Sequence, residues 1–461
     1  MRPSVRQAGV ARDSLLDLLE ALVRDQGRAR RTLNLVPSEN ILSPLARVPF
    51  VLDAYSRYFF DHFRKFGSWC FYGALEPGRI EIDVLLPLLR ELAGAPHVTV
   101  QPLSGLNCMT VALSALTRPG DCVVTVPPTC GGHISTAGVA ARLGLRTMTL
   151  PMRGLFDIDD RALAALLRTA RPALVYIDQS TQLFPIDPMA IRAQIDRESP
   201  STRLHVDSSH VNGLILFGAM WNPLDRGADT FGGSTHKTLP GPHKGFLATR
   251  DAQLFRSIEA SADVFVSHHH PADVLSLAIT LLELKAFDGW SYAARVCSNA
   301  KRLAERLHDG GIAVAASDRG FTACHQVWVD PGAGSAEEIA ATLAGAGVNV
   351  NRLSDIPGHF HAAFRLSVAE ITRLGAIDSD IDAVAMVLQR AIVDRTDSET
   401  LRRGLDETLP RLNRPRYCFD ARDEALVVRA PQLAALAEAL SRFTESAGTH
   451  QHRWAGKGPS S

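Results

Sequence analysis

Cysteine is scarce in this chain of 461 residues, and no two cysteines stand at the C-x-x-C spacing of a metal or redox site. Their number is odd and their spacing is irregular, which argues against a disulfide framework and against a zinc site. This usage is typical of a reducing, cytoplasmic environment. The cysteines are Cys70, Cys108, Cys122, Cys130, Cys297, Cys324 and Cys418.

An excess of charge of either sign is also missing. Lysine and arginine together number 49, and so do aspartate and glutamate. The chain therefore has no electrostatic reason to bind nucleic acid or a membrane surface. The longest apolar run, near residues 211–221, is too short to span a bilayer. Residues 1–23 lack the apolar core of a secretory signal and indicate a polar leader that enters an amphipathic helix, so we expect a soluble cytoplasmic protein.

Short apolar segments alternate with segments of helical periodicity from about residue 83 to residue 234. Runs such as 121–128 and 173–180 predict buried strands, whereas 105–116 and 161–170 predict helices. This alternation implies an α/β fold with a mostly parallel sheet that is covered on both faces.

The chain is longer than one typical domain. After about residue 297 its pattern changes to a few strands with covering helices, which predicts a second, smaller α/β unit. We expect an N-terminal arm or helix at residues 1–45, a large domain at 46–295, a small C-terminal domain at 296–445 and a disordered tail at 446–461.

Polar and glycine residues follow five of the predicted strands where each strand ends. In an open α/β sheet, ligands bind at the carboxyl ends of the strands, so we expect these residues to line one crevice. They are Ser104 and Gly105, the segment Gly131 to His133, Ser180, the pair Asp207 and His210, and the segment Ser234 to Lys237.

This combination of groups predicts a pyridoxal-phosphate site. A lysine such as Lys237, on a loop of small residues, forms a Schiff base with an aldehyde. A buried carboxylate such as Asp207 keeps a pyridine nitrogen protonated, so that the ring accepts electrons. Ser104, Gly105 and the start of the next helix offer backbone N–H groups to a phosphate.

Six segments in the same order resemble the serine hydroxymethyltransferase family, over roughly residues 33 to 390. The resemblance implies the fold-type-I, aminotransferase-like architecture, pyridoxal 5′-phosphate as cofactor, and an obligate homodimer with active sites at the subunit interface. The segments are NLVPSEN (34–40), HVTVQPLSG (97–105), CGGH (130–133), VDSSHVNGL (206–214), STHKTLPGPHKG (234–245) and AAFRLSV (362–368).

The resemblance also implies roles for individual residues. Lys237 carries the cofactor, Asp207 pairs with the pyridinium nitrogen, and His133 stacks on the ring. His210 and Ser180 lie near its phenolic oxygen. Arg365 clamps the substrate carboxylate with help from Ser38, and Tyr58 and Tyr72 match active-site tyrosines. The residues expected to make phosphate and loop contacts are Ser104, Gly105, Leu106, Ser234, Thr235, His236 and His270.

Departures from the family pattern lie in the folate half of the site. Phe60 occupies the position of a family glutamate that moves protons with the folate, and the Arg-Gly-Gly that follows the lysine loop is replaced by His-Lys-Gly at residues 243–245. Together with GFTACHQV (320–327) and EPG (76–78), these changes resemble the folate-independent L-threonine transaldolases. That resemblance implies a retro-aldol cleavage of threonine, release of acetaldehyde and aldol addition to a second aldehyde.

Several alternatives remain open at this point. A folate-dependent hydroxymethyltransferase, a simple threonine aldolase and a non-catalytic homologue fit many of the same residues. Tyr55 competes with Tyr58 for the tyrosine role, and Asp207 has the residue type of a helix N-cap. The run His268 to His270 suggests a metal site, but three consecutive side chains do not face one way on a regular element, so we expect no metal.

Overall fold

The structure is a computed structural model that describes residues 5–59, 71–332, 336–353, 356, 360–406 and 409–445. The predicted tail at 446–461 and the segment from Phe60 to Cys70 lie outside the described residues, so their predictions stay untested. No helix of the described part is long and apolar enough to cross a bilayer.

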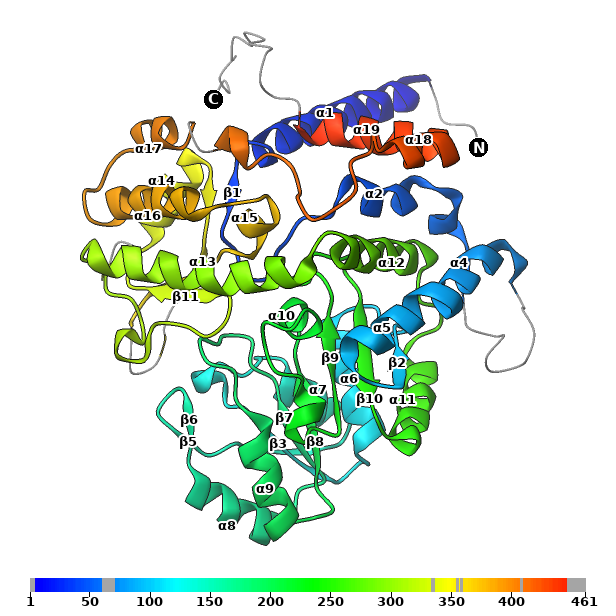
Figure 1. The fold of residues 1–461 in the computed structure, drawn as a ribbon, viewed down its shortest axis with the longest axis vertical. Coiled ribbons are helices and arrows are strands. Elements are labelled where there is room, and N and C mark those ends of the chain that lie inside the picture. The colour runs from blue at the N-terminus through cyan, green and yellow to red at the C-terminus, as the bar shows by residue number, and fades with distance from the viewer. Residues whose placement is uncertain are drawn as a thin grey trace.

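A seven-stranded sheet forms the centre of the lower half of the molecule in Figure 1. Strand β10 is antiparallel to both neighbours and the other pairs are parallel, which confirms the predicted α/β fold with a mostly parallel sheet. The strands, in spatial order, are β2 (His97–Thr99), β10 (Gly245–Thr249), β9 (Thr230–Ser234), β8 (Arg203–Asp207), β7 (Leu174–Ile177), β3 (Cys122–Thr125) and β4 (Arg146–Thr149).

Both faces of this sheet are buried, because successive side chains of its strands enter two different apolar clusters. In β7, Leu174 and Tyr176 pack in one cluster, and Val175 and Ile177 pack in the other. The first cluster is covered by α6 (Gly105–Leu116), α7 (Thr136–Arg142) and α11 (Ala252–Phe265). The second is covered by α5 (Leu86–Ala93), α8 (Asp160–Ala170), α9 (Pro188–Glu198), α10 (Asn212–Leu216) and α12 (Pro271–Ala286).

A smaller antiparallel sheet, in the order β11–β14–β13, forms the other half. Its strands are β11 (Gln326–Val329), β13 (Asn351–Leu353) and β14 (Ala363–Ser367). The strand β1 (Leu33–Asn34) pairs with β12 (Val348–Asn349), so the N-terminal segment is tied to this half. The helices around it are α13 (Gly289–Asp309), α14 (Ala336–Ala346), α15 (Ala369–Arg373), α16 (Asp378–Ile392) and α17 (Ser398–Leu405).

Helix α13 connects the two halves. Its Tyr292 and Val296 belong to the cluster under the large sheet, whereas Ala300 and Leu303 belong to the cluster of the small half. The predicted boundary at 295/296 falls inside this helix, and the domain division stays a prediction.

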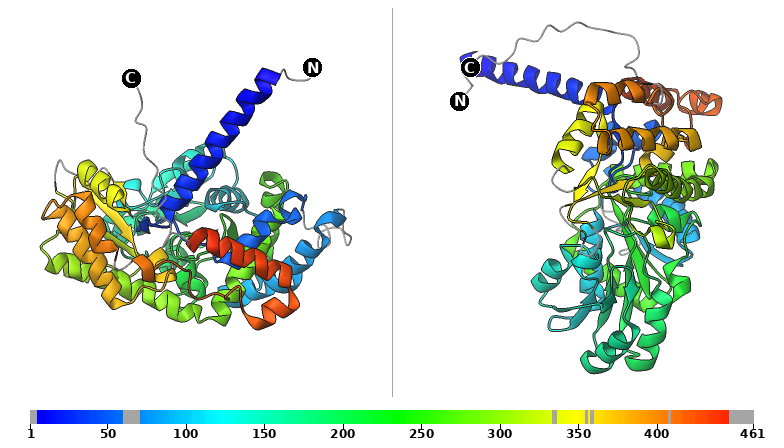
Figure 2. Two further views of the ribbon diagram at one scale, coloured as in Figure 1. Left: turned by 90° about the horizontal axis from the view of Figure 1, so that it is seen from above. Right: turned by 90° about the vertical axis from the view of Figure 1, so that its left-hand side faces the viewer.

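Helix α1 (Val5–Ala29) projects from the body of the molecule, as both views of Figure 2 show. The remaining helices are α2 (Pro44–Arg47), α4 (Leu75–Ile80), α18 (Glu424–Arg429) and α19 (Pro431–Glu445). Between α4 and α5 the chain forms one π-helical turn, η4 (Glu81–Leu85). Short 3-10 turns and the hairpin β5 (Met152–Arg153) and β6 (Asp157–Ile158) complete the fold.

Gly232 on β9 lies in close contact with the backbone of β10. Its φ is +155°, and a Cβ there would lie 2.0 Å from the carbonyl oxygen of Phe246 on β10. Gly232→Ala is therefore expected to lower the free energy of unfolding by roughly 2–4 kcal/mol, through a clash with rigid backbone. Urea denaturation measures this change. The control is Gly138→Ala in α7, where a Cβ meets nothing within 4 Å, and a small gain in stability is expected. Equal effects of the two variants would contradict the prediction.

Candidate active site

A cavity of about 190 Å³ lies at the carboxyl ends of β7, β8 and β9 and at the N-terminus of α6. It brings together ten of the residues that the sequence predicted. These are Ser104, Gly105, Leu106, His133, Ser180, Asp207, His210, Ser234, His236 and Lys237. The lining residues that were not predicted are Met109, Asp178, Gln179 and Ser209.

The loop that carries Lys237 is held by hydrogen bonds on both sides of the lysine. The amide of Asn40 donates to the carbonyl oxygen of Lys237 at 2.5 Å, and the Thr235 hydroxyl donates to that of Pro242 at 2.7 Å. Burial lowers the pKa of the Lys237 amine to about 8, although Asp207 raises it and Arg365 lowers it further. An appreciable fraction of the amine is therefore neutral near pH 7 and able to attack an aldehyde.

Asp207 is the last residue of β8, and its carboxylate faces the cavity with three donors behind it. Ser209 donates from its backbone N–H at 3.0 Å and from its hydroxyl at 2.6 Å, and the Tyr176 hydroxyl donates at 3.2 Å. The N-cap of α10 is Val211, so Asp207 does not cap this helix and the capping interpretation is wrong. A rigid carboxylate at this place can accept a hydrogen bond from a ring N–H.

An anion cradle lies where α6 begins. The Ser104 hydroxyl accepts from Asn107 N–H at 3.1 Å and caps the helix, and Gly105 is the first helical residue. The Ser234 hydroxyl is buried beside them and has no hydrogen-bond partner among the described residues. A Cβ on Gly105 would lie 3.1 Å from Ser234 Cβ, so the glycine keeps this space open. A helix N-terminus next to an unsatisfied buried donor can bind a phosphate.

His133 and His210 are uncharged groups of this cavity. The Nδ1 atom of His133 accepts from the Ser135 N–H at 3.2 Å, and burial lowers the pKa of the ring despite the nearby Asp207 carboxylate. His210 is buried, with Nδ1 3.4 Å from Nε2 of His325, and burial places its pKa well below the usual value. His133 therefore lines the cavity with a neutral ring.

Arg365 lies in the middle of β14 and does not itself line the cavity. It connects the small sheet to the cavity by hydrogen bonds. Its guanidinium donates to the Ser180 carbonyl at 2.9 Å, to the Thr181 hydroxyl at 3.1 Å and to the Asn351 side chain at 2.8 Å. Burial lowers the pKa of Arg365 to about 10, so it stays cationic at neutral pH. In the described chain all three acceptors are neutral, and a carboxylate ligand is attracted to this charge.

Besides Arg365, five predicted residues do not line this cavity. Thr235 uses its hydroxyl within the loop, and Ser38 lies in a turn. Tyr58 and Tyr72 are 44% and 74% exposed, and the Tyr58 hydroxyl is 2.6 Å from that of Ser267. His270 is exposed and pairs with Asp273 at 3.4 Å.

The histidine run does not gather into a metal site. His268 stacks on Tyr58, His269 reaches Glu81, and His270 points to Asp273. Among the described residues no three metal-ligating side chains come together. Each ring therefore has a different outside partner, and the rings of His268 and His270 also contact each other, with centroids 4.7 Å apart.

Asp178 is a site residue that the sequence prediction missed. Its carboxylate accepts from the Thr136 hydroxyl and from the Val126 N–H, and burial raises its pKa to about 7. The available signal was its place at the end of β7, next to Ser180. Asn40 was missed as well, although it belongs to the NLVPSEN segment and its side chain holds the lysine loop.

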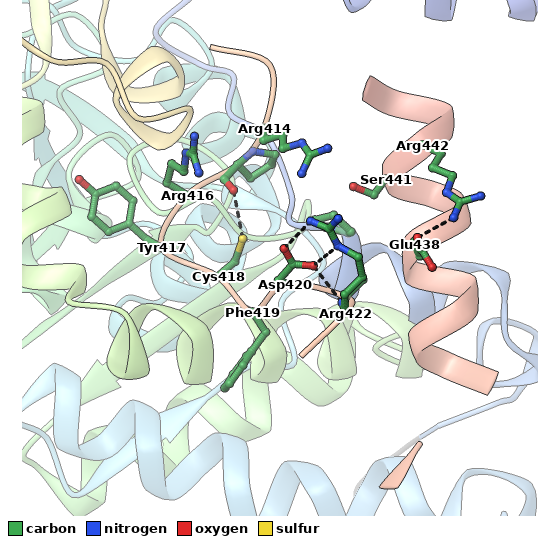
Figure 3. Close-up of a pocket in the computed structure, with 13 residues that line it drawn as sticks. Arg414, Arg416, Tyr417, Cys418, Phe419, Asp420, Arg422, Glu438, Ser441 and Arg442 are labelled. Carbon is green, nitrogen blue, oxygen red and sulfur yellow. Dashed lines mark hydrogen bonds and ion pairs between the residues drawn. The ribbon is translucent and has the colours of Figure 1, made fainter. Parts of the chain in front are cut away.

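A second cavity, of about 400 Å³, lies between residues 414–422 and α19 (Figure 3). Arginines dominate its lining, but its acids are paired with them: Arg422 with Asp420 at 3.0 Å and Arg442 with Glu438 at 2.7 Å. None of the predicted site residues lines it. Without an amine or a strand-end carboxylate, it does not offer the chemistry of the first cavity.

Known proteins are similar to this chain in sequence and in fold. The sequence model of the serine hydroxymethyltransferase family matches residues 12–388, and the chain belongs to this family. It is 40% identical over 362 residues to an L-threonine:uridine-5′-aldehyde transaldolase from Streptomyces sp, which covers 78% of this chain and 87% of the relative. A protein of the same name from Amycolatopsis sp is 38% identical over 383 residues, with 82% of this chain and 92% of the relative covered.

A solved structure agrees with the sequence comparison. The crystal structure of an L-threonine transaldolase from Pseudomonas fluorescens, in the internal aldimine state, superimposes with a TM-score of 0.81 at 28% identity and covers 95% of this chain and 100% of that chain. The family and this aldimine indicate pyridoxal phosphate as the cofactor. The described residues fit it: Lys237 offers the amine, Asp207 a partner for the ring nitrogen, and the α6 N-terminus with Ser234 a phosphate cradle.

The pKa of Lys237 predicts how fast the apoprotein takes up pyridoxal phosphate. The rate should rise about tenfold per pH unit below pH 8 and level off above it, because only the neutral amine attacks the aldehyde. Asp207→Asn should shift this midpoint to lower pH, since Asp207 raises the pKa of the lysine, and Arg365→Met should shift it to higher pH. Stopped-flow absorbance measures the rates. A midpoint that neither variant moves would contradict the assignment.

Proposed function

We propose that this protein is a pyridoxal-phosphate-dependent L-threonine transaldolase, which cleaves threonine to acetaldehyde and transfers the glycyl unit to a second aldehyde. The similarity at 38% and 40% identity to two L-threonine:uridine-5′-aldehyde transaldolases carries this proposal. A nucleoside 5′-aldehyde is the acceptor that we infer from these relatives.

Lys237, Arg365 and Asp207 have separate roles in the proposed reaction. Lys237 would hold the cofactor through its amine. Arg365, assisted by Ser38, would bind the threonine carboxylate and so orient the amino acid for cleavage of its Cα–Cβ bond. Bound pyridoxal phosphate supplies the electron sink for the pair that this bond releases. Asp207 accepts a hydrogen bond from the ring N–H and so keeps the ring electron-poor.

The other polar residues orient rather than react. His133 would stack on the ring, and His210 and Ser180 would lie near its phenolic oxygen. Phosphate contacts come from the α6 N-terminus, Ser234 and His236. The half-buried ring of His236, whose pKa burial lowers to about 3, stays neutral and stacks on His243 with centroids 3.9 Å apart. A neutral ring beside the phosphate can donate a hydrogen bond without adding a positive charge that competes with the lysine for Asp207.

Threonine and a panel of aldehydes test the activity. We expect acetaldehyde release and, with uridine-5′-aldehyde, a new β-hydroxy-α-amino acid, which mass spectrometry detects. Lys237→Ala should abolish both and remove the visible absorbance of the bound cofactor. Serine cleavage that requires tetrahydrofolate would favour a hydroxymethyltransferase. Acetaldehyde release that no acceptor diverts would favour a threonine aldolase, and cofactor binding without turnover a non-catalytic homologue.

A homodimer with shared active sites is part of the same proposal, and the cytoplasm is its expected location. Helix α1 exposes a helical stripe of Leu15, Leu18, Leu19 and Leu22, each at least 47% exposed. Such a stripe on a projecting helix is typical of an interface. Tyr58 and Tyr72 are exposed on their own chain, which suits tyrosines that serve the active site of a second copy.

The dimer prediction is tested by light scattering and by subunit mixing. Leu15→Lys with Leu19→Lys should dissociate the dimer, whereas the control Asp17→Ala on the same helix should not. Mixing equal amounts of inactive Lys237→Ala and of the strongly impaired Tyr58→Phe should restore about a quarter of the wild-type activity, because half of the dimers are mixed and each regains one intact site. A monomeric wild-type protein would contradict the proposal.

A further inference from the structure

A second lysine of the same loop, Lys244, is buried to 1% exposure. Its ammonium group donates to the carbonyl oxygen of His269 at 2.8 Å, and this is a contact to the loop that precedes α12. A buried ammonium is costly unless it is paired, so a chain that keeps one gains something other than packing.

His269, whose carbonyl oxygen accepts from Lys244, also contacts a carboxylate through its ring. The Nε2 atom of His269, which is fully buried, lies 2.7 Å from Oε2 of Glu81. Glu81 is 2% exposed and begins the π turn η4 between α4 and α5. Burial lowers the pKa of Lys244 to about 8, and the carboxylates of Glu81 and, to a smaller extent, Asp273 raise it. A π turn is an irregularity that helices keep mostly at functional positions.

These contacts connect the lysine loop to the segment that carries Tyr58. On one side, the backbone oxygen of Lys244 accepts from Thr235 N–H at 3.0 Å, two residues before Lys237. On the other side, the His269 N–H donates to the Phe59 carbonyl at 3.2 Å. Tyr58 also stacks on His268, with ring centroids 4.6 Å apart.

We infer that Lys244 is a positioning residue that, through His269 and Glu81, fixes the 267–270 loop and with it Tyr58, which the proposed dimer presents to the active site of the second copy. The inference rests on the proposed role of Tyr58 in the transaldolase. Lys244 does not line the cavity, so any effect on the reaction passes through other residues.

A double-mutant cycle on the holoenzyme tests the inference. Lys244→Met should lower kcat/KM for threonine about tenfold in the wild-type background and less than about twofold in the Tyr58→Phe background, because its effect passes through Tyr58. Lys244→Arg, which keeps a cationic donor, should recover most of the loss. The matched control is Lys285→Met, which removes a lysine whose ion pair with Glu91 at 2.6 Å is on the surface; activity should not change.

Equal losses in the two backgrounds would overturn the inference, and so would full activity of Lys244→Met. If Lys244→Met does not fold, Glu81→Gln, which keeps the side-chain shape, should show the same coupling to Tyr58→Phe. Failure of the proposed function is recognised separately, because wild-type protein would then release no acetaldehyde. In that case the same cycle is measured on the binding constant of glycine, from the change in cofactor absorbance.

Discussion

The amine of Lys237 lies between two opposing influences, and the rest of the site depends on their balance. Burial and the charge of Arg365 favour the neutral amine that attacks an aldehyde, whereas Asp207, the proposed partner of the ring nitrogen, favours the charged form. The sheet satisfies both demands because β8 and β9 are neighbours. Asp207 ends one strand, and Ser234, three residues before the lysine, ends the other. Gly233 permits their approach, since a Cβ there would lie 2.7 Å from the Asp207 carboxylate.

Much of the fold and of the cavity was predictable from the sequence for a physical reason. Parallel strands end at one edge of a sheet, so the polar residues after each strand meet without any further information. Lys237, Asp207, His133 and Ser234 were found in this way. The missed residues have weaker signals. Asp178 lies within a strand-end run that already contained a better candidate, and Asn40 acts through its side chain on a carbonyl about two hundred positions away in sequence.

The tyrosines show the limit of reasoning from one chain. Spacing identifies Tyr58 and Tyr72 as family tyrosines, yet neither approaches the cavity of its own chain. A contact between two copies depends on which exposed surfaces meet. The hydrophobic periodicity of α1 indicates an apolar face but not what that face contacts. Lys244 is a different case: its residue type was visible as a departure from the family, but its contact to His269 depends on how two distant loops pack.

Arg365 has a consequence for the mechanics of the two halves. It belongs to the small sheet, while Ser180 and Thr181, which accept its hydrogen bonds, follow β7 of the large one. In the proposed role of Arg365, an amino-acid carboxylate would compete with these acceptors for the guanidinium, so ligand binding and the contact between the two halves would use the same donor groups. A ligand that lacks the carboxylate would leave the hydrogen bonds of Arg365 across the two sheets as they are.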